Sequence, residues 1–241
     1  MGETRGLPSD GEELQAAFAR IEAAVEAGES DLSKLGFWRA LRVVKLDPAL
    51  SEHWADTAGR IDRKAFENGV KRRFPVLFGN LVLLAETLLG AAAIVLAMRT
   101  SNSTLAGLAL VAAAIAWSVS LHCLAHWLFG RLVGIGFLYY SFAGPFPPRP
   151  GLKTDYATYL RAAPGERAWM HASGALATKG APFIALGFWW GTDAPAWAAW
   201  ATSALGLLQI STDVFLSTKT GDWKKVKRER AVARAQIARR A

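Results

Sequence analysis

The stretch Ser120-Leu121-His122-Cys123-Leu124-Ala125-His126-Trp127 stands near the end of a long apolar run and carries two of the four histidines of the chain. Residues four apart lie on one face of a helix, with Cβ atoms about 6 Å apart. Two imidazoles at that spacing can bind one metal ion. The stretch therefore predicts a metal site within an apolar helix.

Apolar residues make up 52% of the 241-residue chain and gather after Pro75 in long runs. Uninterrupted apolar runs of about 18 residues or more are typical of membrane spans. We expect four, at about 75–98, 104–129, 167–190 and 194–217. Tryptophans around the last short loop fit interfacial anchors: Trp189, Trp190, Trp197 and Trp200. The fold predicted is an all-α polytopic membrane protein.

Basic residues lie before the first run, after the second and after the fourth, whereas the loops near Asn102 and Asp193 hold almost none. Positive residues mark the cytoplasmic side of a membrane. We therefore expect a multi-pass protein of the cell (inner) membrane with both termini cytoplasmic. The net charge of +8 then indicates topology and contact with anionic lipid, not nucleic-acid binding.

Three regions follow from this pattern. Residues 1–74 should form a small cytoplasmic helical region, because Leu14, Phe18, Ile21 and Val25 give Glu13 to Ala27 an amphipathic pattern. Residues 75–217 form the membrane domain, and 218–241 form a basic cytoplasmic tail. His53, in the first region, is expected to be an ordinary surface or packing histidine.

The segment Gly134 to Pro148, between the second and third runs, is aromatic, β-prone and closed by Gly and Pro. It is too short and broken to span a bilayer. We expect a membrane-embedded β-hairpin-like loop that lines a cavity, since irregular backbone at depth must be shielded from lipid. Such a strand could pair with an extended peptide.

Several polar residues occupy positions along the predicted spans that place them in the same leaflet of the membrane. With the second and fourth spans running inward and the third outward, five lie near the cytoplasmic ends: His122, His126, His171, Asp213 and Asp222. Glu86 and Lys179 lie deeper, at equal depth, so we expect them to form a buried ion pair, because an unpaired charge there is costly. Glu86 could alternatively be a proton-carrying carboxylate near the site.

The order of these groups along the chain matches a known arrangement. His122 and His126 have the type and spacing of the paired histidines in His-Glu-x-x-His, and Gly221-Asp222-Trp223 follows the last span. Over about 104–225 the chain thereby resembles the site-2 protease family of intramembrane zinc metalloproteases, whose Asp-Gly motif falls at that place. The resemblance implies zinc held by His122, His126 and Asp222, embedded β structure between core helices, and peptide hydrolysis inside the membrane.

Two departures weaken the expected activity. Cys123 stands at the position where the family has the Glu that acts as general base, and Asp213-Val-Phe-Leu lacks the proline of the family's Asn-x-x-Pro. A substitute base could be Asp213, Glu86 or a carboxylate on a partner. We expect a zinc site with weak or lost peptidase activity, whose substrate would be a transmembrane helix or an extended peptide.

Other interpretations remain open. The histidines could simply pack or form hydrogen bonds in a helix bundle. His171 could be a reserve ligand that closes the zinc site, and Asp213 could replace Asp222. Haem, held by His171 with His122 or His126, is a lesser option. The chain could also be a non-catalytic relative that binds a metal, a pigment or a partner as a subunit of a larger membrane complex.

Overall fold

The computed structural model describes residues 11–143, 149–217 and 221–240, and these are mostly helical. The chain forms two compact units. The first comprises the chain up to Phe74, Val133–Gly165 and the chain from Arg230 onward. The second comprises Pro75–Leu132 and Glu166–Glu229.

Four helices among the described residues lie wholly within the first unit: α1 (Gly11–Glu26), α2 (Phe37–Val44), α3 (Pro48–Gly69) and α6 (Tyr156–Arg161). The four apolar positions of α1 are buried, which confirms the predicted N-terminal helix. Phe18 stacks on Trp54 of α3, with ring centres 4.7 Å apart. Helix α3 begins at Pro48 because the carboxylate of Asp47 accepts a hydrogen bond from the backbone N–H of Ala49.

A three-stranded sheet also belongs largely to this unit, with the order β1 (Arg73–Pro75), β2 (Phe137–Ala143) and β3 (Arg149–Thr154). Strands β2 and β3 pair antiparallel, with Tyr140 opposite Leu152. Gly134, whose φ of 79° suits a residue without a Cβ, makes the turn that leads into β2. The segment Gly134 to Pro148, where a hairpin was expected, supplies the strand β2, but its partner β3 lies beyond that segment, and residues 144–148 lie outside the described part of the chain.

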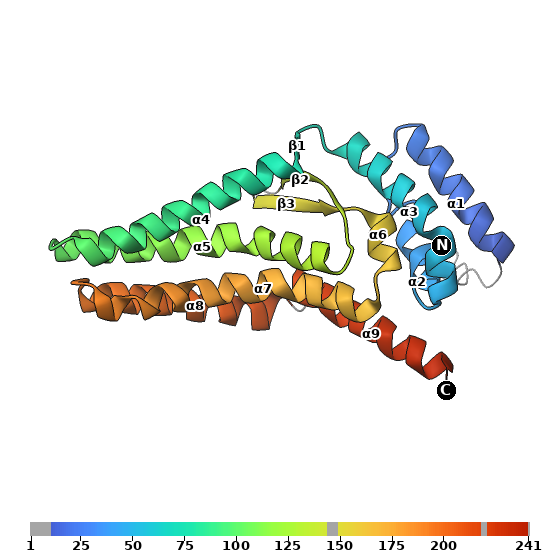
Figure 1. The fold of residues 1–241 in the computed structure, drawn as a ribbon. Coiled ribbons are helices and arrows are strands. Elements are labelled where there is room, and N and C mark those ends of the chain that lie inside the picture. The colour runs from blue at the N-terminus through green and yellow to red at the C-terminus, as the bar shows by residue number, and fades with distance from the viewer. Residues whose placement is uncertain (1–10, 144–148, 218–220, 241) are drawn as a thin grey trace. The chain divides into compact units, whose positions relative to one another are not determined.

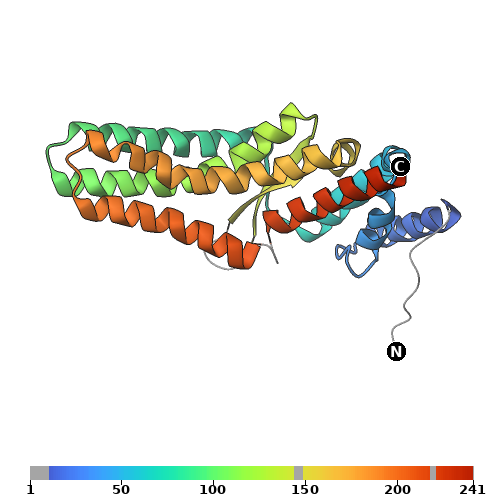
Figure 2. The ribbon, with the colours of Figure 1, turned by 90° about the horizontal axis from the view of Figure 1, so that it is seen from below.

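The second unit is built from long helices that run side by side: α4 (Val76–Arg99), α5 (Ser103–Leu132), α7 (Pro164–Gly187) and α8 (Ala196–Thr212) (Figures 1 and 2). A short 3₁₀ turn, η1 (Trp189–Gly191), lies between α7 and α8. Beyond α8 come the π-helical turn η2 (Asp213–Ser217) and α9 (Asp222–Arg240). Small side chains fill the common core, among them Ala106, Ala113, Ala185 and Ala198. Such residues allow close approach of helix backbones.

Two helices, α4 and α5, are long and apolar enough to cross a membrane by length and composition. They coincide with the first two predicted spans. Among the helices described, α7 and α8 do not meet the same criterion, since α8 has only 17 residues and α7 is less apolar, with polar residues such as His171 and Lys179 along its length. The structure therefore supports a mostly helical protein with two candidate spans.

Candidate metal centre

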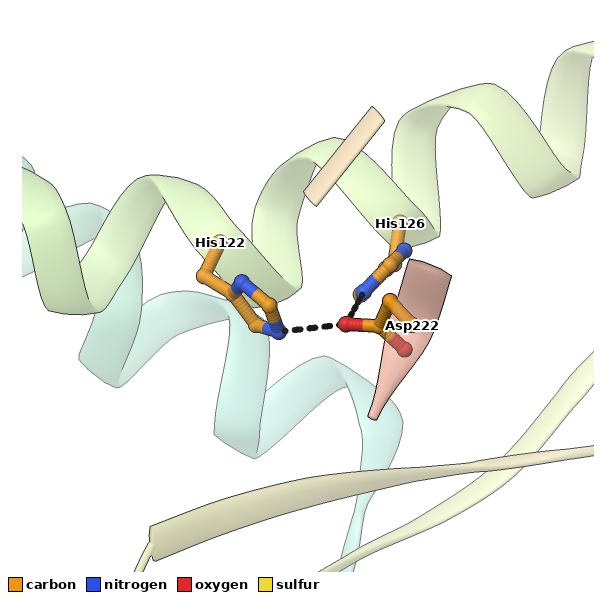
Figure 3. A group of neighbouring side chains, drawn as sticks. All are labelled: His122, His126 and Asp222. Atoms are coloured by element: carbon orange, nitrogen blue, oxygen red, sulfur yellow. Dashed lines mark hydrogen bonds and ion pairs between the residues drawn. The ribbon is translucent and has the colours of Figure 1, made fainter. Parts of the chain in front are cut away.

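Three side chains converge at one point in the second unit. His122 and His126 project from α5, and Asp222 projects from the first turn of α9 (Figure 3). Oδ2 of Asp222 lies 3.5 Å from Nε2 of His122 and 3.3 Å from Nε2 of His126. One ligand atom from each residue lies within 4.8 Å of the others. The structure thus brings together the three residues that we predicted from the sequence as metal ligands.

Hydrogen bonding fixes the tautomer of His126. Its Nδ1 lies 2.6 Å from the carbonyl oxygen of Met170 on α7. A carbonyl can only accept, so Nδ1 carries a proton, and Nε2, which faces Asp222, is the ring nitrogen left to bind a cation or a proton. The hydroxyl of Ser173 donates to the same carbonyl at 2.8 Å.

His122 is oriented in the same way through a hydroxyl. Its Nδ1 lies 2.9 Å from Oγ1 of Thr178 on α7. Thr178 already donates its one hydroxyl proton to the carbonyl of Gly174 at 3.0 Å, so it accepts from Nδ1–H of His122. Its Nε2 is therefore likewise the nitrogen left to bind a cation or a proton, and it faces Asp222.

Two imidazole nitrogens and a carboxylate oxygen consequently meet at one place. Acceptors cluster in this way around a cation, and second-shell bonds from the far ring nitrogen are typical of metal-binding histidines. The edges of a tetrahedron of nitrogen and oxygen ligands around zinc measure about 3.3–3.5 Å. The two histidine–Asp222 distances match that edge, and all three ligand atoms lie within 4.8 Å of one another, so the donor set suits zinc if the ligands draw slightly closer around the ion. A proton on one imidazole is the competing occupant.

Asp222 is held as an anion. Burial alone would raise the pKa of its carboxyl, but the hydrogen bond with His126 and the nearby charges of His126, Lys225 and His122 hold that pKa well below its usual range. Lys225 Nζ contacts the other oxygen, Oδ1, at 3.1 Å. Helix α9 carries Asp222 against α7 because Val226 and Trp223 pack on small side chains there.

His171 lies beside this group. Its ring centre is 6.3 Å from that of His126 and the ring is buried. Cys123 is also buried, yet it is not part of the three-residue group. A residue next to His122 in a helix points about 100° away from the face that carries the two histidines. This direction explains why Cys123 lies outside the group.

Among the described residues, the predicted ion pair between Glu86 and Lys179 is not formed, because Lys179 has another partner. Lys179 forms an ion pair with Asp213 of η2 and also donates to the carbonyl of Ala175 at 2.8 Å. Glu86 is half-buried on α4, and within the described chain no ion pair joins it to Lys179. Equal depth in two helices does not set the direction in which each side chain points. Asp213 is thus bound by Lys179 and does not replace Asp222 in the group.

Several residues that shape the centre had not been identified from the sequence. Met170, Gly174 and Thr178 follow one another at intervals of four on α7, and they contact or orient the two histidines. That spacing is visible in the sequence and indicates one helix face. Nothing in the pattern says which neighbouring helix the face meets.

No known protein family, no curated protein and no solved structure matches this chain. The geometry of its own residues must therefore carry any functional conclusion.

Proposed function

We propose that the chain is a membrane-embedded zinc protein of the site-2 protease type whose peptidase activity is weak or lost. One observation carries the proposal: His122, His126 and Asp222 present three possible ligand atoms to one point, and both histidines are oriented by bonds from Nδ1. Zinc is commonly held by such nitrogen and oxygen ligands, and catalytic sites keep a fourth position open.

The membrane part of the proposal includes four spans with cytoplasmic termini. Helix α7 has 24 residues, and α8, with 17, continues directly into the 5 residues of η2. A span needs about 20 residues. On this proposal α7 and α8 cross the bilayer beside α4 and α5, with their charged residues placed toward the ends or in ion pairs.

The surface of these four helices supports this reading. Each exposes large apolar side chains that a water-soluble bundle would bury. They include Leu77 and Leu89 on α4, Leu108 and Ile115 on α5, Leu176 and Ile184 on α7, and Trp200 and Leu207 on α8. A hydrocarbon environment accounts for all four helices at once.

The chemistry available to the chain is incomplete. Bound zinc would polarise a peptide carbonyl and acidify a coordinated water. Proton transfer by a positioned side chain adds about 10²–10⁴-fold to such a reaction. The Cys123 thiol is not in the group, and Asp213 is engaged by Lys179. Slow or absent hydrolysis of a transmembrane or extended peptide is the expected consequence.

A non-catalytic role is the second candidate, and the thiol at position 123 favours it. The same centre would then bind a metal to stabilise a subunit of a membrane complex. Haem fits less well, because α7 packs directly on the ring of His126 at Gly174 and leaves no space there for a porphyrin.

Metal analysis of the detergent-purified protein tests the proposal. We expect about one zinc per chain, as in a single mononuclear site. The content should fall to background in His122→Ala, His126→Ala and Asp222→Ala. His53→Ala, which removes an exposed histidine of the first unit, is the matched control and should keep its zinc. Wild-type protein that takes up no zinc would exclude the centre and leave the proton as its occupant.

A further inference from the structure

A second set of polar contacts lies next to the centre and links three elements. Lys179 of α7 pairs with Asp213 of η2, and the indole N–H of Trp223 in α9 donates to Oδ2 of Asp213 at 2.6 Å. The Lys179 and Asp213 side chains are largely shielded from solvent, with exposed fractions of 15% and 23%. These three residues are referred to below as the Asp213 network.

The Asp213 network is linked to the metal centre by the backbone, because Trp223 and Asp222 are neighbours in the sequence. Trp223 directly follows Asp222 at the start of α9. An indole fixed at residue 223 limits how the first turn of α9 can rotate or shift. Asp222 reaches the two histidines from that turn, so a small displacement of the turn would separate its carboxylate from their Nε2 atoms.

The charge on Lys179 has a specific part in this arrangement. Asp213 is a carboxylate with two acceptor oxygens, and one of them accepts from both Lys179 and Trp223. Breaking one partner of a shielded ion pair leaves the other charge uncompensated, which favours rearrangement. Without Lys179, Asp213 would turn away from α7 and take Trp223 with it.

We propose that Lys179, Asp213 and Trp223 are positioning residues that hold the first turn of α9 so that Asp222 completes the metal site. This inference rests on the zinc site proposed above.

The dissociation constant for zinc, measured by competition with a chromophoric chelator, tests the network. Second-shell partners of metal ligands commonly contribute about 10–100-fold to affinity. We expect weakening in that range for Lys179→Met, which removes the charge, and for Trp223→Phe, which keeps the ring and removes the N–H. Lys179→Arg keeps a cation and should restore the affinity to within about threefold of wild type.

Two controls separate positioning from stability. Lys153→Met breaks a shielded lysine–aspartate pair of the first unit, and Trp117→Phe removes an indole N–H that donates to the carbonyl of Thr87. Both should lower thermal stability and leave zinc affinity unchanged.

The outcomes distinguish this inference from the proposed function. Wild-type protein without zinc would remove the site and the network's role together. Wild-type protein with one zinc, and unchanged affinity in Lys179→Met and Trp223→Phe, would overturn the network alone.

Discussion

Gly174 of α7 lies directly against the imidazole of His126: a Cβ built at residue 174 would stand 2.6 Å from both Cδ2 and Cε1 of the ring. No ordinary contact is that short, so α7 and α5 approach here only because residue 174 has no side chain. The close approach also places the carbonyl of Met170 within bonding distance of Nδ1 of the same ring.

Gly174→Ala should therefore displace His126 and weaken zinc binding by about tenfold or more, as expected when a ligand loses its orienting contacts. Gly180→Ala is the matched control, because a Cβ at that position on the same helix meets nothing within 4 Å. It should leave zinc affinity unchanged and raise helix stability slightly. Zinc titration of both variants decides the point; equal affinities would mean that the ring of His126 is not held by α7.

The number of spans can be measured with reporter fusions in the loops near Asn102 and Asp193. If α4, α5, α7 and α8 all cross the bilayer, both loops should report an external location, with the N- and C-terminal fusions cytoplasmic. The two candidate spans alone would give a different pattern. An external signal at Asn102 with a cytoplasmic signal at Asp193 would reduce the protein to α4 and α5 as spans.

Helices α4, α5, α7 and α8 could be predicted from apolar run length, and the pairing of His122 with His126 from their spacing, whereas α9 lies in the segment that we expected only as a basic tail. The approach of Asp222 was expected from the order of the motifs and from a shared depth at the cytoplasmic ends. Run length, histidine spacing and depth are all positions along a helix axis, and motif order is position along the chain. The sequence supplies both directly.

The partner of Lys179 could not be predicted in the same way. Rotation about the helix axis decides whether Lys179 meets Glu86 of α4 or Asp213 of η2, and run length carries no information about rotation. The π-helical turn that begins at Asp213 likewise has no clear sequence signal. The roles of Gly174 and Thr178 depend on which helix their face meets, which only packing sets.

The first unit has its own buried ion pair, in which Lys153 Nζ lies 2.5 Å from Oδ2 of Asp62. Burial raises the pKa of Asp62, and Lys153 only partly offsets this effect. Lys153→Met should cost about 3–5 kcal/mol in the free energy of unfolding at neutral pH, because it leaves a buried carboxylate unpaired.

The sign of the pH dependence follows from the direction of that pKa shift. A carboxyl whose folded pKa lies above its unfolded value takes up its proton first in the folded state, so stability is gained as pH falls. The deficit of Lys153→Met should therefore shrink between about pH 7 and about pH 5. Denaturant unfolding at both values measures it. The double variant Asp62→Asn/Lys153→Met should lose less than the single variant, and a deficit independent of pH would contradict the argument.

Cys123→Glu tests whether the centre retains the geometry of a peptidase. Position 123 is the site at which the site-2 protease family has its general base, and a glutamate side chain is longer than a thiol and carries a proton acceptor. If the rest of the centre is suitable, the variant should cleave a transmembrane test substrate about 10²–10⁴-fold faster than wild type.

The control is Cys123→Gln, which has the same shape as the glutamate variant and cannot act as a base. It should remain as slow as wild type while binding the same amount of zinc. Adding His126→Ala to Cys123→Glu should abolish cleavage, because activity would depend on the metal that His126 helps to hold. A Cys123→Glu protein that binds one zinc and cleaves no faster than Cys123→Gln would count against the protease reading and favour the non-catalytic role, since the metal and the base would then both be present without a productive arrangement.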